Sequence, residues 1–248
     1  MKEKWRCMNG MCKKKGKGLP ANFALSAVSA LAFASILALV LIPRASARTE
    51  RTAAQAGETI PALVKSYGSK NAPITLEVFA DYECPSCGSF YEETLRPMIS
   101  DYVASGKVHL VHRDFPLSMH MYGYEAARWA NAAARIGRFG EAEAALYGNQ
   151  NYWAESGNIE KYMAAALSPE DLKRVEKLMD GCGMNVPPGS HTCALDAYIE
   201  QDRALGNQIP VQATPTFVIY HKGQKFPAAS GVVSWPVLKQ FFDQLLSQ

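Results

Sequence analysis

Blocks of apolar and polar positions predict strands and helices from about residue 60 onward. Residues 74–80 are apolar and β-branched apart from one acid, a pattern typical of a buried strand. Residues 90–95 are helical in composition, and Pro85 suits the first turn of the helix that leads into them. Cys84 and Cys87 therefore stand at a junction between a strand and a helix.

A long helix-rich interval follows this junction. The 100 residues between Phe115 and Thr216 are far more than a simple strand connection needs. Segments rich in Ala, Leu, Glu and Lys predict helices at 124–136, 159–167, 169–179 and 192–205. Glycine and proline separate these segments, and a last helix is predicted at 234–246 with Ser234 as its N-cap. The pattern favours an α/β fold with an inserted helical domain.

The N-terminal part of the chain contains an apolar stretch long enough to cross a membrane. No charged residue lies between Leu19 and Pro43, and a helix over residues 21–42 would measure roughly 33 Å. Residues 1–18 hold seven Lys or Arg against one acid, so the positive-inside rule keeps this tail in the cytoplasm. The sequence thus predicts a transmembrane helix or signal sequence at 19–43, with the remainder periplasmic or extracellular.

Two features of the sequence give opposite predictions on whether the apolar segment at 19–43 is cleaved from the rest of the chain. Ala45-Ser46-Ala47 resembles a signal-peptidase site, which favours a cleaved and secreted form. The apolar run is longer than is usual for a cleaved signal, and on length we prefer an uncleaved single-pass anchor. Residues 44–60 lack apolar periodicity and are predicted to be a linker.

Composition and charge narrow the class of protein. With 248 residues, 48% of them hydrophobic and 20% charged, the chain is not a disordered, collagenous or disulfide-packed miniprotein. From residue 52 onward it holds 16 Lys or Arg against 21 Asp or Glu, so the folded part is acidic. A nucleic-acid-binding domain needs a basic folded part, and this class is therefore excluded.

The six cysteines fall into three pairs with different chemistry. Cys7 and Cys12 lie in the cytoplasmic tail, where they are expected to be free thiols. Cys182 and Cys193 flank a turn-rich segment on the oxidising side, and a disulfide there closes a loop that should stabilise the fold by roughly 3 kcal/mol. We expect this disulfide to be structural, since a turn-rich loop is a poor place for a tuned thiolate.

Cys84-Pro85-Ser86-Cys87 points to reversible redox chemistry. A disulfide across so short a loop restrains the chain very little, so a structural purpose is not expected. At a helix N-terminus, unsatisfied N–H groups stabilise the Cys84 thiolate, whereas Cys87, one turn into the helix, is shielded and placed to resolve a mixed disulfide. Half of a zinc site is the alternative, but no second cysteine pair has ligand spacing, and the five histidines show none either. No metal or cofactor is expected.

Three segments together resemble the DsbA-type thiol-disulfide oxidoreductases of the thioredoxin superfamily. Phe79-Ala80-Asp81-Tyr82-Glu83-Cys84-Pro85-Ser86-Cys87 resembles the family's redox motif. His112-Arg113-Asp114-Phe115-Pro116-Leu117 resembles the end of its next strand, and Ala213-Thr214-Pro215-Thr216-Phe217-Val218-Ile219 resembles its cis-proline loop. The resemblance runs in family order from about residue 58 to 246. It implies a thioredoxin fold with an inserted helical domain, preceded here by the transmembrane helix.

The resemblance also implies roles for individual residues. The Thr214–Pro215 bond is expected to be cis and to lie beside Cys84, where the Thr214 backbone, together with Pro85 and Ser86, contacts the substrate. A buried acid moves protons near the cysteines in relatives, and the two candidates for it are Glu77 and Asp81. For Glu77, which falls within an otherwise apolar strand, a solvated carboxylate is the alternative. The Pro85-Ser86 dipeptide lacks the histidine that helps to hold the thiolate in strongly oxidising members.

The expected organisation is a basic tail at 1–18, the apolar segment, the linker, a thioredoxin core at 61–120 and 207–248, and a helical insertion at 121–206. The leading hypothesis is a monomeric, membrane-tethered oxidase that donates the Cys84–Cys87 disulfide to reduced, extended polypeptides through a mixed disulfide on Cys84. A membrane partner of the DsbB or VKOR type would reoxidise it. The alternatives are a thiol reductase or isomerase of the same fold, and a non-catalytic peptide-binding redox module.

Overall fold

The computed structural model describes residues 63–183 and 192–248, together with the backbone of two short strands near the N-terminus. These strands, β1 (Cys7–Met8) and β2 (Met11–Cys12), pair antiparallel, with Cys7 opposite Cys12. The predicted apolar segment at 19–43 and the linker at 44–60 lie outside the described residues. Among the residues that are described, no helix is long and apolar enough to span a membrane.

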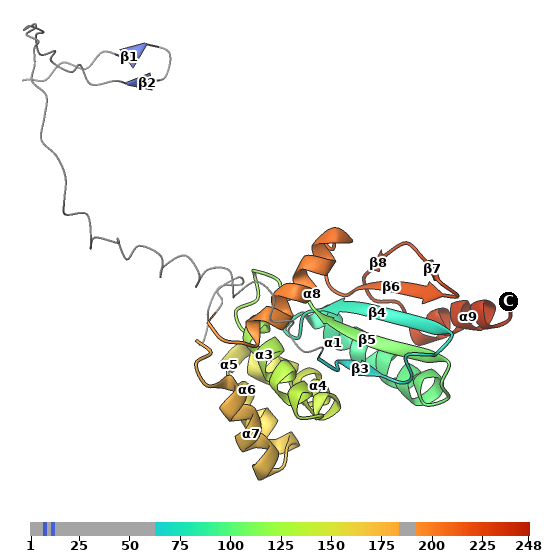
Figure 1. The fold of residues 1–248 in the computed structure, drawn as a ribbon, viewed down its shortest axis with the longest axis horizontal. Helices are drawn as coiled ribbons and strands as arrows, with labels where there is room; N and C mark the ends of the chain where they lie inside the picture. Colours follow the sequence, from blue (N-terminus) through green and yellow to red (C-terminus); the bar gives the residue numbers. More distant parts are fainter. Residues whose placement is uncertain (1–6, 9–10, 13–62, 184–191) are drawn as a thin grey trace, which may run out of the picture. The chain divides into compact units, whose positions relative to one another are not determined.

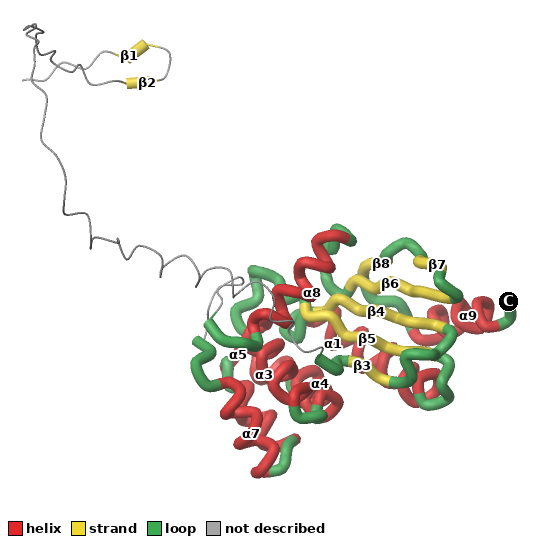
Figure 2. The backbone as a smooth tube through the Cα atoms, in the orientation of Figure 1, coloured by secondary structure: helices red, strands yellow, loops and turns green. Residues whose placement is uncertain are grey.

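A mixed β-sheet forms the centre of the described unit (Figure 2). Its strands lie in the order β3 (Ser66–Tyr67), β5 (Val108–Asp114), β4 (Ile74–Ala80), β6 (Thr216–His221) and β7 (Gln224–Lys225). Strand β8 (Ala229–Ser230) pairs with β6. The central strand β4, which the sequence predicts at these residues, runs parallel to β5 and antiparallel to β6. Strands β3, β7 and β8 have two residues each and are too short to leave an alternating pattern.

One face of the sheet is covered by a long helical segment that starts at Pro85. It comprises α1 (Pro85–Phe90), η1 (Tyr91–Leu95), α2 (Arg96–Met98) and η2 (Ile99–Val103), in which η1 and η2 are wider π turns. Pro97 has no N–H to donate, which accounts for the irregular hydrogen bonding in the middle of this segment. The last helix, α9 (Trp235–Leu246), contacts η1 and α2. Together these helices bury the apolar side chains of β4 and β5 that point toward them.

Helix α8 (Asp196–Gln208) contacts β5 and lies beside a second, smaller apolar cluster. Phe79, Phe115, Val211 and Val218 form this cluster. The backbone comes very close at Gly206, where a Cβ atom would lie 2.5 Å from Cε2 of Phe115. The helix begins at Asp196 rather than at the predicted residue 192, because the Asp196 carboxylate accepts the backbone N–H groups of Thr192 and Cys193 instead.

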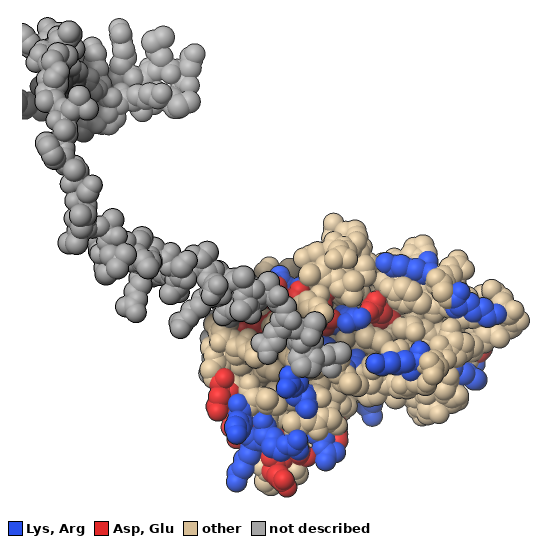
Figure 3. Space-filling model, viewed as in Figure 1, with Lys and Arg blue, Asp and Glu red and all other residues tan. Residues whose placement is uncertain are grey.

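The helical insertion expected between the core strands is present (Figure 1). It contains α3 (Gly123–Arg135), α4 (Phe139–Gly148), α5 (Gln150–Ser156), α6 (Ile159–Ala166) and α7 (Pro169–Met179), followed by α8. Helices α4 and α5 are not predicted from the sequence, because their buried positions do not repeat along one clear face. Lys and Arg side chains lie among Asp and Glu over this part of the molecule on the face that Figure 3 shows.

A disulfide joins the residues that flank α7 and α8. Cys182 follows α7 and Cys193 precedes α8, and their sulfur atoms are bonded. Arg128 of α3 reinforces the junction, since its guanidinium donates to the Asp196 carboxylate at 2.6 Å and to the Thr192 hydroxyl at 2.9 Å. The pair that the sequence assigns to a structural role therefore lies within the helical insertion.

Candidate functional site

The start of α1 positions both cysteines of the Cys84-Pro85-Ser86-Cys87 segment. Cys84 is the N-cap, and its carbonyl accepts the backbone N–H groups of Cys87 and Gly88 at 2.9 and 3.1 Å. Pro85 occupies the first turn, where its missing N–H leaves no hydrogen bond unmade. Both cysteines are free thiols, 7% exposed at Cys84 and 2% at Cys87. Pro85 and Ser86 between them are exposed.

The two thiols differ strongly in acidity. A hydrogen bond from the Cys87 thiol lowers the pKa of Cys84 to about 5; burial opposes this shift, while Thr214 and the N–H groups of Cys87 and Ser86 add to it. Burial raises the pKa of Cys87 well above its ordinary value, and the interaction with Cys84 raises it further. At neutral pH the reduced pair therefore consists of a thiolate on Cys84 and a thiol on Cys87.

The Thr214–Pro215 loop forms the other side of the site, and its peptide bond is cis, as the resemblance implies. Strand β6 follows this loop, and Thr216 pairs with Phe79 near the end of β4. Because β4 and β6 are antiparallel, the residues after β4 and before β6 meet at the same end of the sheet. The sulfur of Cys84 accordingly lies 3.4 Å from the carbonyl oxygen of Thr214.

Asp81 contacts both the cysteine segment and the loop that follows β5. Its backbone N–H points to the sulfur of Cys87 at 3.5 Å. Its carboxylate accepts the backbone N–H groups of Glu83 and Leu117 at 2.9 and 2.8 Å, and lies 2.6 Å from Nδ1 of His120. The Asp81 residue is 1% exposed, so its carboxylate is buried next to the cysteine segment.

Glu77, the other predicted proton carrier, is not part of this site. Side chains alternate along a strand, and Glu77 shares a face of β4 with Phe79 rather than with the residues that pack near Cys87. Its carboxylate binds Arg113 at 2.5 Å and accepts a hydrogen bond from the Tyr220 hydroxyl at 3.1 Å. The alternative of a solvated carboxylate is wrong for Glu77, since this residue is 7% exposed.

Sequence reasoning missed two residues of the site. His120, one of the five histidines without ligand spacing in the sequence, pairs with the Asp81 carboxylate. Gln150 of α5 donates from Nε2 to the carbonyl oxygens of Tyr82 and Cys84 at 2.6 and 2.9 Å, which holds the loop before α1. Both contacts join residues far apart in the chain, and no spacing motif signals them.

The loop that carries His120 also exposes apolar side chains. Met119 is 79% exposed and Met121 is 66% exposed. The backbone N–H of Tyr122 donates to the Glu83 carboxylate at 2.5 Å, so the loop is fixed to the segment just before Cys84 at both of its ends. Two exposed methionine side chains, which adapt readily to different partners, therefore lie on a loop that is attached to the segment just before Cys84.

A second polar cluster is buried around His112 of β5. Nδ1 of His112 lies 2.9 Å from the Glu143 carboxylate, and its Nε2 lies 3.3 Å from Asp114. Burial alone would lower the pKa of His112, but hydrogen bonds and charge from Asp114 and Glu143 raise it to about 9. The described residues contain no group of three or more potential metal ligands.

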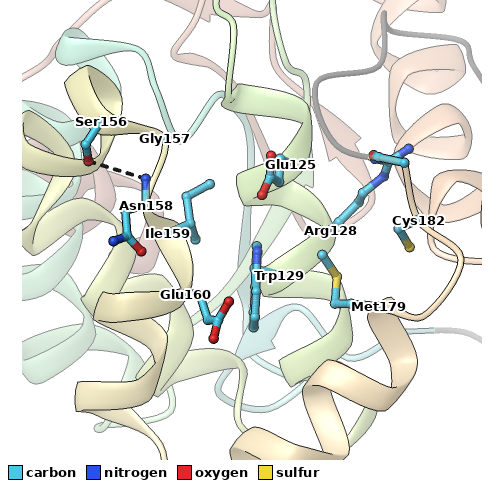
Figure 4. A pocket seen from close by; sticks show the side chains of 11 residues that line it. Glu125, Arg128, Trp129, Ser156, Gly157, Asn158, Ile159, Glu160, Met179 and Cys182 are labelled. Carbon is cyan, nitrogen blue, oxygen red and sulfur yellow. Dashed lines mark hydrogen bonds between the residues drawn. The ribbon is translucent and has the colours of Figure 1, made fainter.

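A cavity of about 340 Å³ lies between α3, α6 and the end of α7 (Figure 4). Its walls include Glu125 and Trp129 of α3, Ile159 of α6, Met179 of α7, and Cys182. None of these described lining residues belongs to the Cys84–Cys87 segment or to the Thr214–Pro215 loop. The cavity thus borders the structural disulfide rather than the free thiols.

Comparisons with known proteins identify relatives of the described unit. A family model described as thioredoxin matches residues 63–230. Over 158 residues the chain is 32% identical to the thiol:disulfide interchange protein DsbG of Escherichia coli, covering 62% of this chain and 56% of DsbG. Over 187 residues it is 34% identical to the Na⁺/H⁺ antiporter NhaA 3 of Salinispora tropica, covering 70% of this chain and 24% of the antiporter. The chain thus spans about half of one relative and a quarter of the other.

Solved structures show the same fold. The α-DsbA1 protein of Wolbachia pipientis superimposes with a TM-score of 0.60 at 19% identity, covering 76% of this chain and 93% of that one. BdbD of Bacillus subtilis gives a TM-score of 0.54 at 18% identity, covering 74% and 93%. The thioredoxin-like α/β fold with a helical insertion, which the sequence predicts, is confirmed.

Proposed function

The chain belongs to the thioredoxin family and has the fold of the DsbA-type thiol-disulfide oxidoreductases, and from this premise we propose that it is an extracytoplasmic protein disulfide oxidase. It passes the Cys84–Cys87 disulfide to reduced substrate proteins. The observation that carries the proposal is the placement of the two thiols: Cys84 is the N-cap of α1, with its sulfur 3.4 Å from the carbonyl oxygen of Thr214, whereas Cys87 is 2% exposed. In keeping with this placement, the pKa of Cys84 is lowered to about 5 and that of Cys87 is raised.

The two thiols divide the reaction between them. A substrate thiolate attacks the sulfur of Cys84, which breaks the Cys84–Cys87 bond, and Cys87 leaves with its electron pair and takes up a proton. A second substrate thiolate then attacks the substrate's own sulfur in the mixed disulfide. Cys84 departs as a stable thiolate, and thiols with a low pKa leave fastest.

An extended, apolar polypeptide is the substrate that this surface favours. The carbonyl of Thr214 next to the Cys84 sulfur offers a backbone hydrogen bond to a strand laid beside it. Met119 and Met121 add adaptable apolar contacts, which suit clients of varied sequence. Pro85 and Ser86, which lie between the cysteines, are exposed where the polypeptide approaches Cys84.

Three further parts of the proposal rest on the sequence alone. Residues 19–43 hold the protein in the membrane as a single-pass anchor or direct its export, which places the redox site on the oxidising side. A membrane oxidoreductase of the DsbB or VKOR type accepts the two electrons from the reduced Cys84–Cys87 pair. The protein acts as a monomer.

Client oxidation by the full chain tests the function. The oxidised protein should convert a reduced, unfolded dithiol protein to its disulfide, and Cys84→Ser should abolish this conversion. Cys87→Ser should accumulate mixed disulfides on Cys84, visible on non-reducing gels. The double variant Cys182→Ser/Cys193→Ser is the matched control, because it removes two cysteines outside the site and should retain the activity.

The reduction potential of the Cys84–Cys87 couple decides the direction of electron flow. Equilibration with glutathione should give a value near about −120 mV, as expected of a disulfide donor. A value near about −270 mV would contradict the proposed direction and favour a reductase. A non-catalytic peptide-binding module predicts instead that Cys84→Ser leaves the cellular function intact.

A further inference from the structure

We propose that His120, held by Asp81, is a positioning residue that places a positive charge beside the Cys84 thiolate and thereby makes the Cys84–Cys87 disulfide more oxidising. This inference rests on the proposed function, because it concerns the same thiol pair. It assigns a role to a residue outside the sequence motif. The segment between the cysteines, Pro85-Ser86, carries no charge of its own.

The backbone of Asp81 fixes its position relative to both cysteines. Its carbonyl oxygen accepts the N–H of Cys84 at 3.1 Å, and its own N–H points to the sulfur of Cys87 at 3.5 Å. Its side chain is fully buried, whereas the imidazole of His120 is 18% exposed and lies 2.6 Å from it through Nδ1. The residue that anchors the cysteine loop therefore also holds the histidine at the site.

Two backbone hydrogen bonds limit the freedom of the loop on either side of His120. The carboxylate of Asp81 accepts the N–H of Leu117, three residues before His120. Glu83 accepts the N–H of Tyr122, two residues after it. The loop is thus attached on both sides of His120 to the segment that leads into Cys84, so the imidazole keeps one place relative to the thiolate.

The surrounding charges favour the protonated imidazole. The hydrogen bond to Asp81 raises the pKa of His120; burial opposes the shift, and the negative charges of Asp81, Glu83 and Cys84 add to it. The interaction between His120 and Cys84 is mutual, because a thiolate that stabilises the imidazolium is stabilised by it to the same extent. Below the raised pKa of His120 this stabilisation is present, and it is lost as the imidazole loses its proton.

The positive charge of His120 stabilises the reduced state of the cysteine pair, as the electrons and protons of the reaction show. A substrate dithiol gives up two electrons and two protons as it becomes a disulfide, and the Cys84–Cys87 bond accepts both electrons and breaks. One proton goes to Cys87 and the other to solvent, which leaves a thiolate on Cys84 next to the His120 imidazolium. Only the reduced state contains this pair, so the charge favours reduction of the enzyme and oxidation of the client.

A variant of His120 in the full chain tests the inference. His120→Gln keeps a polar side chain but removes the charge. The equilibrium constant with glutathione should shift about tenfold toward the disulfide, which corresponds to about 30 mV for a two-electron couple. The pH midpoint for alkylation of Cys84 should rise by about one unit, since a tenfold change corresponds to one pKa unit.

Two further variants separate charge from local structure. His120→Lys restores a cation and should return the equilibrium constant to within about threefold of the unaltered protein, because the stabilisation is electrostatic. Ser118→Ala, at an exposed position in the same loop, should change neither the constant nor the midpoint. The inference is overturned if His120→Gln matches the unaltered protein, or if His120→Lys behaves like His120→Gln.

The role of His120 and the proposed oxidase function are tested by different quantities. The absolute potential of the unaltered protein tests whether it is an oxidase, whereas the difference between it and His120→Gln tests the role of the histidine. A strongly reducing protein with a tenfold His120 effect would reject the oxidase and retain the inference. A strongly oxidising protein without that effect would do the opposite.

Discussion

At the scale of single residues, the site depends on two identical side chains in unequal surroundings. Cys84 faces hydrogen-bond donors from the start of α1 and from Cys87, whereas Cys87 is enclosed in the core. Donors stabilise a thiolate, and an apolar enclosure destabilises it. The start of a helix directly after a strand thus gives the two thiols unequal surroundings, and Thr214 adds to the lowering of the Cys84 pKa.

The reduced protein should therefore react with iodoacetamide at one cysteine of this pair. Alkylation of Cys84 should follow a titration with a midpoint near pH 5, in line with its lowered pKa. Cys87 should stay unmodified across this range until the protein is denatured, because its thiol is buried and protonated. Peptide mass spectrometry after alkylation at a series of pH values measures both, and a Cys84 midpoint near 8.5 would contradict the assignment.

The residues that bear the chemistry are more predictable than the residues that tune it. Cys84, Cys87 and Pro215 belong to short segments whose spacing carries information. His120 and Gln150 act across loops and helices that the sequence does not place relative to the cysteines. Glu77 and Asp81 differ because Glu77 lies within β4, whereas Asp81 follows Ala80, the last residue of that strand, in the loop before α1. Such pairings depend on tertiary structure, which local patterns do not encode.

At the scale of elements, the position of α8 on the sheet depends on one glycine. Gly206 lets the helix backbone approach the rings of Phe115 and Phe79, and an added Cβ would lie 2.7 Å from Cδ2 of Phe115 and 3.2 Å from Cδ1 of Phe79. These rings belong to a dense cluster and cannot move far without displacing Val218. Helix α8 can therefore lie this close to the sheet only because residue 206 has no Cβ atom.

Gly206→Ala should destabilise the protein by about 1–3 kcal/mol, because it overpacks this contact. Gly148→Ala is the matched control: Gly148 also lies in a helix, and its added Cβ would meet nothing within 4 Å. That variant should be neutral or stabilising by up to about 1 kcal/mol. Urea unfolding of both variants measures the difference, and equal free energies of unfolding would show that the Gly206 contact is not tight.

Elements with a strong hydrophobic pattern occur at the residues where they are predicted. Short elements, and elements that carry buried polar residues, do not. The apolar run of β4 and the proline-started helix α7 occur at the predicted residues. Helices α4 and α5 carry buried residues such as Glu143 and Gln150 whose polar groups are satisfied by distant partners. A polar residue that is buried through long-range bonds weakens the helical pattern, and its element is then missed.

At the scale of the whole molecule, a buried ionic network joins parts of the chain that are far apart in sequence. Lys65, near the start of the described unit, pairs with Asp114 of β5 and with Asp202 of α8. Asp114 also approaches His112, which in turn pairs with Glu143 of α4. Removal of one partner from such a network leaves an uncompensated buried charge.

This network makes stability depend on pH. The pKa of His112 is raised from about 6.5 in an unfolded chain to about 9 in the folded protein, so its contribution is complete below pH 6.5 and is lost as pH rises through 9. The loss should be about 1–3 kcal/mol. Thermal unfolding of the oxidised protein, in which the redox cysteines do not titrate, should show a falling Tm across this interval.

His112→Gln should remove this pH dependence, and it should lower the stability most at pH 6. His109→Gln is the control, since burial lowers the pKa of His109 and its proton contributes nothing in this interval. A Tm that stays constant between pH 6.5 and 9 in the unaltered protein would show that His112 is neutral in the folded state.

The order of the strands has a consequence for biosynthesis. The Cys84 segment follows β4, whereas the Thr214 loop precedes β6, and the entire helical insertion is translated between them. A chain made from its N-terminus therefore presents both redox thiols before the loop that completes the site exists. Pairing β6 with β4 closes a long loop and belongs to the slow class of folding events. The nascent protein thus passes through a stage in which both thiols are present before the Thr214 loop lies beside Cys84, and only the completed fold brings the two halves of the site together.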